Sequence, residues 1–96
     1  AETLNELVEL FAVECPKLMQ RIRDAIAGHS PSELQRAAHT LKSSIQIFGA
    51  QRPAEAALRL ETMGEKGDLA DAQQAWSALA GEIERLMSML SDLRES

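Results

Sequence analysis

Hydrophobic residues recur along most of the chain at intervals of three and four, which is the spacing of one face of an α-helix. The clearest stripe lies in the last third of the sequence and consists of Ala72, Trp76, Leu79, Ile83, Leu86, Leu90 and Leu93. Such a seam is typical of a helix in a bundle, although a dimeric coiled coil has the same pattern. Because the chain offers other amphipathic helices as partners for this seam, we expect a monomer.

Two helices are predicted in the first 28 residues. Thr3 and Glu6 have the spacing of a capping box and predict the start of a short first helix. Pro16 suits the first turn of a second helix, because its missing N–H is not needed there, and Gly28 marks the end of that helix. The apolar faces of the two helices are Leu4, Leu7, Val8 and Phe11, and then Leu18, Ile22, Ala25 and Ile26.

The third predicted helix runs from about Ser30 to Phe48. Ser30 is a suitable N-cap, Pro31 occupies the first helical position, and Glu33 is placed to reach back to the cap. Gly49 can adopt the left-handed conformation that ends many helices. The residues on its predicted buried face are Leu34, Ala37, Ala38, Leu41, Ser44, Ile45 and Phe48.

A fourth helix is predicted to begin at Pro53 and to break at Gly67 or Asp68, with Gly64 weakening its last turn. Short connections make successive helices antiparallel neighbours. Residues 1–96 are therefore expected to form a single all-α domain. Its predicted architecture is an up-down-up-down four-helix bundle with a short extra N-terminal helix packed across it.

Composition and charge narrow the possible functions. Hydrophobic residues make up 45% of the chain and aromatic residues 3%, so the core must be aliphatic. A net charge of −5 argues against contact with nucleic acid or with an anionic membrane surface. The single cysteine, Cys15, allows no internal disulfide, and neither a signal peptide nor an apolar run of about 18 residues is present. We expect a cytoplasmic protein.

His39 is the side chain that packing does not explain. On the third helix it falls about 160° from Leu41, so its ring should face solvent. Its helical neighbours are Gln35, Arg36, Lys42, Ser43 and Gln46. An exposed imidazole is partly neutral at cellular pH and keeps a lone pair on one ring nitrogen, so it can act as a nucleophile. An ordinary solvated histidine would occupy the same position, and spacing alone leaves both interpretations open.

The residues around His39 favour acceptance of a group that another protein delivers. No Gly-rich phosphate loop is present, and Ser43 beside His39 lacks the third group of a catalytic triad. A phosphoryl group fits best, because Lys42 and Arg36 could offset its negative charge. Ile47 projects about 120° from Leu41 and suits either partner docking or half-burial against the first helix.

The other titratable residues discussed here are not expected to form a functional site. His29 lies at a helix junction and is expected to be a loop residue, since no metal-ligand spacing surrounds it. Glu55, Glu61 and Glu65 are expected to be solvated surface acids. No metal site is predicted in this chain.

The segment Ala38-His39-Thr40-Leu41-Lys42, closed by Phe48-Gly49-Ala50, resembles the signature of histidine-containing phosphotransfer (HPt) domains. The resemblance extends over nearly the whole chain. It implies that His39 is phosphorylated, that Lys42 supports the phosphate, and that the partners are receiver domains, which supply the aspartate and the magnesium. The chain departs from the signature at Ser43, where the family usually has glycine to let the receiver approach the ring.

The leading hypothesis is a phosphocarrier that is not an enzyme in its own right. His39 would accept a phosphoryl group from a receiver-domain aspartyl phosphate, in a response regulator or a hybrid sensor histidine kinase, and pass it to another response regulator. Lys42 and Arg36 would support the phosphate, and Gln35, Ser43, Gln46 and Ile47 would contact the partner. The alternative, which Ser43 keeps open, is a non-catalytic bundle that binds a receiver with His39 unmodified. A histidine kinase dimerisation domain is disfavoured, because its pattern places an acid where this chain has Thr40.

Overall fold

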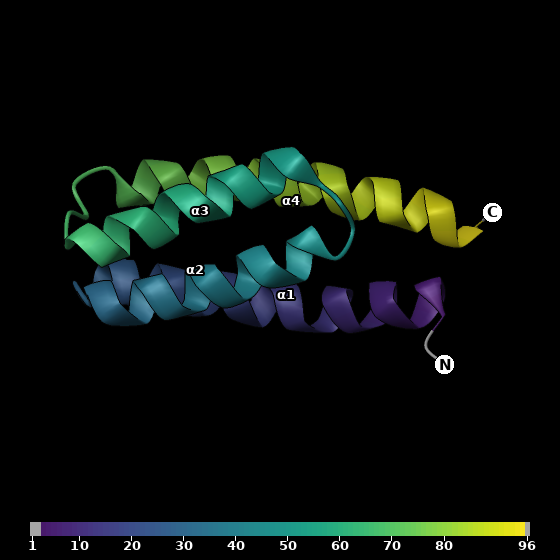
Figure 1. Ribbon diagram of the computed structural model, residues 1–96, viewed down its shortest axis with the longest axis horizontal. Helices are drawn as coiled ribbons and strands as arrows, with labels where there is room; N and C mark the ends of the chain where they lie inside the picture. The colour runs from purple at the N-terminus through teal and green to yellow at the C-terminus, as the bar shows by residue number, and fades with distance from the viewer. Residues whose placement is uncertain (1–2, 96) are drawn as a thin grey trace.

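The computed structural model describes residues 3–95, with the side chains of residues 3–93. Within this range the chain forms four helices and no strand. They are α1 (Leu4–Ala27), α2 (Pro31–Gln46), α3 (Gln51–Lys66) and α4 (Ala72–Glu95) (Figure 1). The first and last helices, α1 and α4, have 24 residues each, whereas α2 and α3 have 16. At 1.5 Å per residue, α1 and α4 are therefore each about 12 Å longer than the middle pair.

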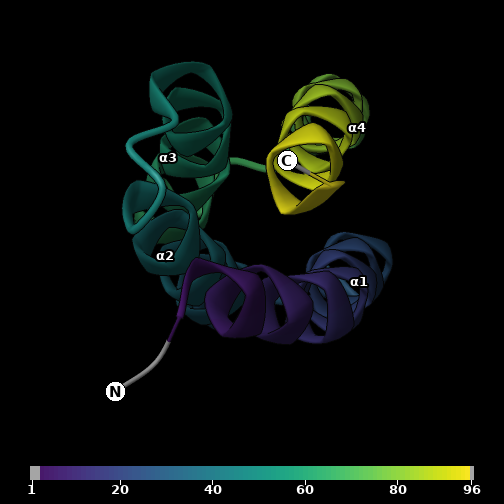
Figure 2. The ribbon, with the colours of Figure 1, turned by 90° about the vertical axis from the view of Figure 1, so that its right-hand side faces the viewer.

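The helices run up, down, up and down, and they pack in a ring. α1 contacts α2 and α4, and α3 contacts the same two helices, so that α1 lies diagonally opposite α3 (Figure 2). The first and last described residues lie at the same end of the bundle, where α1 and α4 extend past the connection between α2 and α3 (Figure 1). The predicted all-α bundle is confirmed.

The core between the helices is aliphatic, as the composition predicts. No described polar or charged side chain is fully buried. Phe11 and Phe48 meet edge to face with ring centroids 5.3 Å apart, which joins the first half of α1 to the end of α2. The largest fully buried side chains are Val8, Ile22, Leu34, Leu41, Ile45, Leu60, Leu79 and Leu90.

The first helix corrects the sequence prediction. Instead of a short helix followed by a second one at Pro16, α1 is continuous from Leu4 to Ala27, with Pro16 inside it. Proline removes one backbone hydrogen bond and strains the preceding turn. Phe11, Cys15 and Leu18 are nevertheless buried on one continuous face across the proline, and Pro16 itself is exposed. The structure therefore has no separate N-terminal helix packed across the bundle.

The ends of α2 follow the predicted signals, apart from the cap. Pro31 is in the first turn, and Gly49 adopts the left-handed conformation with φ +67°. The Ser30 side chain makes no capping hydrogen bond. Glu33 does not reach back to it, because Glu33 accepts a hydrogen bond of 2.7 Å from Arg21 of α1. The hydrogen bond from Arg21, together with the charges of Arg21 and Arg36, holds the pKa of Glu33 below its usual value.

Candidate functional site

His39 projects from the middle of α2 toward solvent. Its helix is fixed by a buried opposite face, on which Ala38 and Leu41 have no exposed surface, while the His39 side chain is 59% exposed. The nearby hydroxyl of Thr40 donates to the backbone carbonyl of Arg36 at 3.0 Å and is tied to the helix rather than to the ring. The imidazole is thus presented on a rigid element, as the helical spacing predicts.

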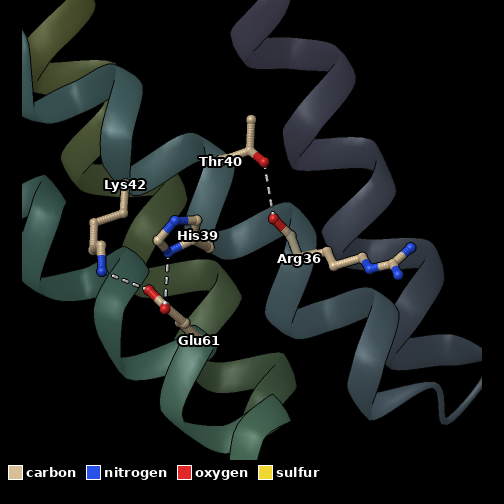
Figure 3. A network of polar contacts seen from close by, with 5 residues as sticks. All are labelled: Arg36, His39, Thr40, Lys42 and Glu61. Atoms are coloured by element: carbon tan, nitrogen blue, oxygen red, sulfur yellow. Dashed lines mark hydrogen bonds and ion pairs between the residues drawn. The ribbon is translucent and has the colours of Figure 1, made fainter.

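A carboxylate from α3 joins His39 to Lys42. Oε2 of Glu61 lies 3.0 Å from Nδ1 of His39, and Oε1 lies 2.8 Å from Nζ of Lys42 (Figure 3). The Glu61 side chain is only 14% exposed and that of Lys42 only 17%. Oε1 is closed to solvent, so the Lys42 ammonium is its counter-charge. The prediction that Glu61 is a solvated surface acid is wrong.

The charge of Glu61 decides which nitrogen of His39 carries the proton. Burial of the carboxyl raises its pKa, but contacts with Lys42 and His39 lower it by more, and the pKa of Glu61 ends below its ordinary value. An ionised carboxylate only accepts hydrogen bonds, so Nδ1 of His39 must donate to it. The lone pair of the neutral ring is then on Nε2, the nitrogen that Glu61 does not contact.

Gly64 lets α3 come close enough to α2 for this contact. It lies one turn after Glu61 and is buried. A Cβ atom at this position would lie 2.6 Å from the carbonyl oxygen of Pro31 and 2.7 Å from the backbone nitrogen of Gln35. The sequence marks Gly64 as a weak point of its helix, whereas in the structure it is the contact point between two helices.

Of the other predicted site residues, Gln35 and Arg36 line a hollow beside the ring, whereas Ser43, Gln46 and Ile47 do not. Arg36 is exposed and points away from His39 toward α1 (Figure 3). Gln35 is half-buried, and Ser43, Gln46 and Ile47 are exposed. A hollow of about 620 Å³ lies beside the ring, and it also includes Arg21 of α1, which the sequence did not indicate. Its lining residues are Arg21, Gln35, Arg36, His39, Thr40 and Glu61.

Two further observations concern the chain as a whole. No helix within residues 3–95 is both long and apolar enough to cross a membrane. A family model described as the Hpt domain matches residues 6–94, from the first turns of α1 to the last turn of α4. The chain belongs to the Hpt family. Hpt domains are the histidine phosphotransfer modules of phosphorelays; they carry a phosphoryl group and interact with receiver domains. No match was found among curated proteins or among solved structures.

In this Hpt domain the side chains of α2 divide into two groups. Lys42 turns toward α3 and is engaged by Glu61, whereas Arg36 and Thr40 lie on the side of α1 (Figure 3). His39 lies between the groups; its Nδ1 contacts Glu61, and its side chain is more than half exposed. The arrangement holds an exposed imidazole in one orientation and leaves the lone pair of the neutral ring on Nε2.

Proposed function

We propose that His39 accepts a phosphoryl group on Nε2 from the aspartyl phosphate of a receiver domain and passes it to the aspartate of another response regulator. The observation that carries this proposal is the 3.0 Å contact between Nδ1 of His39 and the carboxylate of Glu61. It leaves the lone pair of the neutral ring on Nε2, which Glu61 does not contact, in a side chain that is 59% exposed and in a chain that belongs to a phosphotransfer family.

The proposed step needs no proton transfer. The Nε2 lone pair attacks phosphorus, the bond from phosphorus to the aspartyl oxygen breaks, and the aspartate leaves as a carboxylate with the electron pair. The proton stays on Nδ1, so the phosphorylated ring gains positive charge, which the Glu61 carboxylate offsets. In-line positioning and charge neutralisation dominate phosphoryl transfer, so a carrier needs little catalytic machinery of its own.

The remaining roles in the proposal are divided between the two proteins. The receiver supplies the aspartate and the Mg²⁺, and this domain is a phosphocarrier rather than an enzyme. Lys42 holds Glu61 and adds positive charge beside the ring, and Arg36 adds charge on the side of α1. We propose that the domain acts as a cytoplasmic monomer. Its partners would be receivers of response regulators or of a hybrid sensor histidine kinase, and Gln35, Ser43 and Gln46 would contact them.

The test is phosphotransfer from a panel of receiver domains labelled with ³²P on aspartate. Wild-type domain should gain an acid-labile label, and His39→Gln should gain none while its circular dichroism stays unchanged. His29→Asn is the matched control, because His29 is the only other histidine and lies exposed in a loop at φ +51°, which asparagine tolerates. Label that persists in His39→Gln, or that disappears in His29→Asn, would refute the assignment.

The same experiment separates a phosphocarrier from a docking module. A bundle that only binds receivers would leave His39 unlabelled and the lifetime of the receiver's aspartyl phosphate unchanged. A phosphocarrier shortens that lifetime and recovers the lost label on His39. The two activities therefore differ in where the phosphoryl group is found at the end of the reaction.

A further inference from the structure

Arginine side chains from two helices line the hollow beside His39. Its volume is about 620 Å³, and its charged lining residues besides Glu61 are Arg36 of α2 and Arg21 of α1. A phosphoryl group on the ring would lie beside this hollow, because the ring is part of its wall. Phosphoryl groups on proteins carry a charge of about −1.5 to −2 at neutral pH, and guanidinium groups bind them with paired hydrogen bonds.

The Lys42 ammonium is not free to bind such a group. It lies 2.8 Å from Oε1 of Glu61, and that oxygen is closed to solvent. If Lys42 turned to a phosphoryl group, the enclosed carboxylate of Glu61 would lose its counter-charge, which is costly in a site with little solvent. A cation that moves on phosphorylation is therefore expected among the arginines of the hollow.

Arg21 is held by a contact that is easily exchanged. Its guanidinium donates to Glu33 at 2.7 Å, but the two side chains are 49% and 42% exposed. Exposed ion pairs contribute little to stability, because water and salt screen them. Arg36, three residues after Glu33, also lowers the pKa of Glu33 by its charge. Glu33 therefore keeps a positive neighbour when Arg21 leaves.

We infer that Arg21 binds phosphohistidine: its guanidinium moves from Glu33 to the phosphoryl group when His39 is phosphorylated. This inference rests on the proposed function. Glu33 is six residues before His39, which is about 9 Å along the axis of α2. Rotation about the side-chain bonds of Arg21 moves the guanidinium into the hollow without movement of a helix. The phosphoryl group has more charge than the carboxylate it replaces as a partner, so the exchange stabilises the phosphorylated domain.

The equilibrium constant for phosphoryl exchange with a receiver measures this stabilisation. It depends on the free proteins in their two states, and not on how they dock or how fast transfer runs. The probe is the receiver that labels His39 fastest in the panel above, and the distribution of ³²P is measured from both directions. Arg21→Gln should shift the equilibrium toward the phosphorylated receiver by about fivefold to tenfold, the effect of one charge-assisted hydrogen bond at a partly exposed site.

Arg23→Gln is the matched control for Arg21→Gln. It makes the same change of charge on the same helix, but the Arg23 guanidinium lies over Trp76 of α4, 5.4 Å from the ring centroid. Arg23 is not part of the wall of the hollow beside His39. The equilibrium constant of Arg23→Gln should therefore stay within twofold of wild type.

Glu33→Gln distinguishes phosphate binding from the loss of an ion pair. Arg21→Gln and Glu33→Gln both remove the contact between these two residues, so a purely structural role would change the equilibrium in the same direction. Phosphate binding predicts opposite directions, because Glu33→Gln frees the guanidinium. We expect Glu33→Gln to shift the equilibrium toward phosphorylated His39 by about twofold to threefold, and to do so much less when Arg21→Gln is also present.

NMR of the arginine side chains follows the exchange directly. The domain is phosphorylated with phosphoramidate, a small-molecule phosphoryl donor, in the His29→Asn background, where His39 is the only histidine. The Nε–Hε signal of Arg21, assigned through its absence in Arg21→Lys, should shift on phosphorylation. The corresponding signal of Arg23 should not shift.

Each outcome decides the role of Arg21. An equilibrium constant within twofold of wild type in Arg21→Gln, an equal change in Arg23→Gln, or the same direction of change in Glu33→Gln overturns it, and so does an unmoved Arg21 signal. All four leave phosphotransfer by His39 intact. A wild-type domain that no receiver labels refutes the proposed function instead, and the spectrum of the chemically phosphorylated domain still decides whether Arg21 binds the phosphoryl group. Circular dichroism and urea unfolding verify that the variants are folded.

Discussion

At the scale of single residues, Glu61 controls the site because its two oxygens contact different partners. One holds the proton of the His39 ring on Nδ1, and the other faces the Lys42 ammonium. Lys42 is thus already paired with Glu61 in this structure. In this structure the lysine contacts the carboxylate and not the ring, so it orients Glu61, and Glu61 lies between its charge and His39.

Replacement of Glu61 by glutamine should therefore show how much the orientation of the His39 ring contributes to the acceptance of a phosphoryl group. The neutral amide can either donate to Nδ1 or accept from it, so the ring loses its preferred tautomer. We expect phosphotransfer to slow by roughly tenfold to a hundredfold, the usual cost of losing a group that orients a reactive ligand. Imidazole ¹⁵N chemical shifts should show Nδ1–H for His39 in the wild type and a tautomer mixture in Glu61→Gln. The signals of His29 serve as the internal reference, and an unchanged tautomer with an unchanged rate would contradict this role.

The sequence predicts one half of this network and not the other. The exposure of His39 follows from its place on α2, because a helix with Ala38 and Leu41 fully buried must present residue 39 to solvent. Glu61 is 22 residues away on another helix, and no local pattern links it to His39. One signal was available: Glu61 adjoins the buried stripe of Ala57 and Leu60, where a side chain is neither in the core nor free in solvent.

At the scale of elements, the distance between α2 and α3 depends on Gly64. We expect Gly64→Ala to destabilise the domain by about 1–3 kcal/mol, because the added methyl group meets rigid backbone atoms and the helices must separate. Glu61 would move with α3, so phosphotransfer should slow as well. Urea unfolding measures the first effect and the labelling assay the second.

Gly81 provides the control for that substitution. It is also inside a helix, α4, but a Cβ atom there would meet no neighbouring atom within 4 Å. Gly81→Ala should therefore stabilise the domain by about 0.5–1 kcal/mol, the gain expected from helix propensity alone. If both variants were stabilised, the close approach at Gly64 would not restrict the packing of α2 against α3.

The helices show which element boundaries a sequence can predict. The start of α2 at Pro31 and the turn at Gly49 depend on local backbone chemistry, which the sequence carries directly. Pro16 is a misleading signal, because proline favours the first turn of a helix but is also tolerated inside a helix when packing compensates. The buried series Val8, Phe11, Cys15, Leu18 and Ile22 continues at intervals of three and four through the proline. That series, with Cys15 counted as apolar, is the signal for a single helix.

At the scale of the whole molecule, the aliphatic core and the polar contacts around His39 occupy different parts of the bundle. The interior is aliphatic, and no described polar side chain is fully buried there. The polar contacts of Glu61 with His39 and Lys42 lie between α2 and α3, whereas the exposed side chains of Leu10 and Ile47 line a hollow between α1 and the end of α2. That Leu10 and Ile47 lie near each other could not be predicted, since it depends on the pairing of α1 with α2 and on the continuity of α1.

The free energy of unfolding should depend on pH in a way that reflects the contacts of Glu61 with His39 and Lys42. The pKa of Glu61 is lower in the folded state than the 4.5 of an ordinary glutamate, so folding favours the ionised form. Its contribution is fully present above about pH 4.5 and is lost as the pH falls through the lower, folded-state pKa. Urea midpoints measured from pH 7 to pH 2 should therefore decrease more steeply in the wild type than in Glu61→Gln, whose side chain does not titrate.

Glu33→Gln is the comparison for that profile, because the pKa of Glu33 is also lowered, by its hydrogen bond and ion pair with Arg21. The Arg21 and Glu33 side chains are 49% and 42% exposed, whereas Glu61 is largely enclosed, so solvent screens the Glu33 pair more strongly. Glu33→Gln should thus keep most of the acid dependence of the wild type. If Glu61→Gln followed the wild-type profile throughout, the contacts with Lys42 and His39 would not lower the pKa of Glu61 on folding.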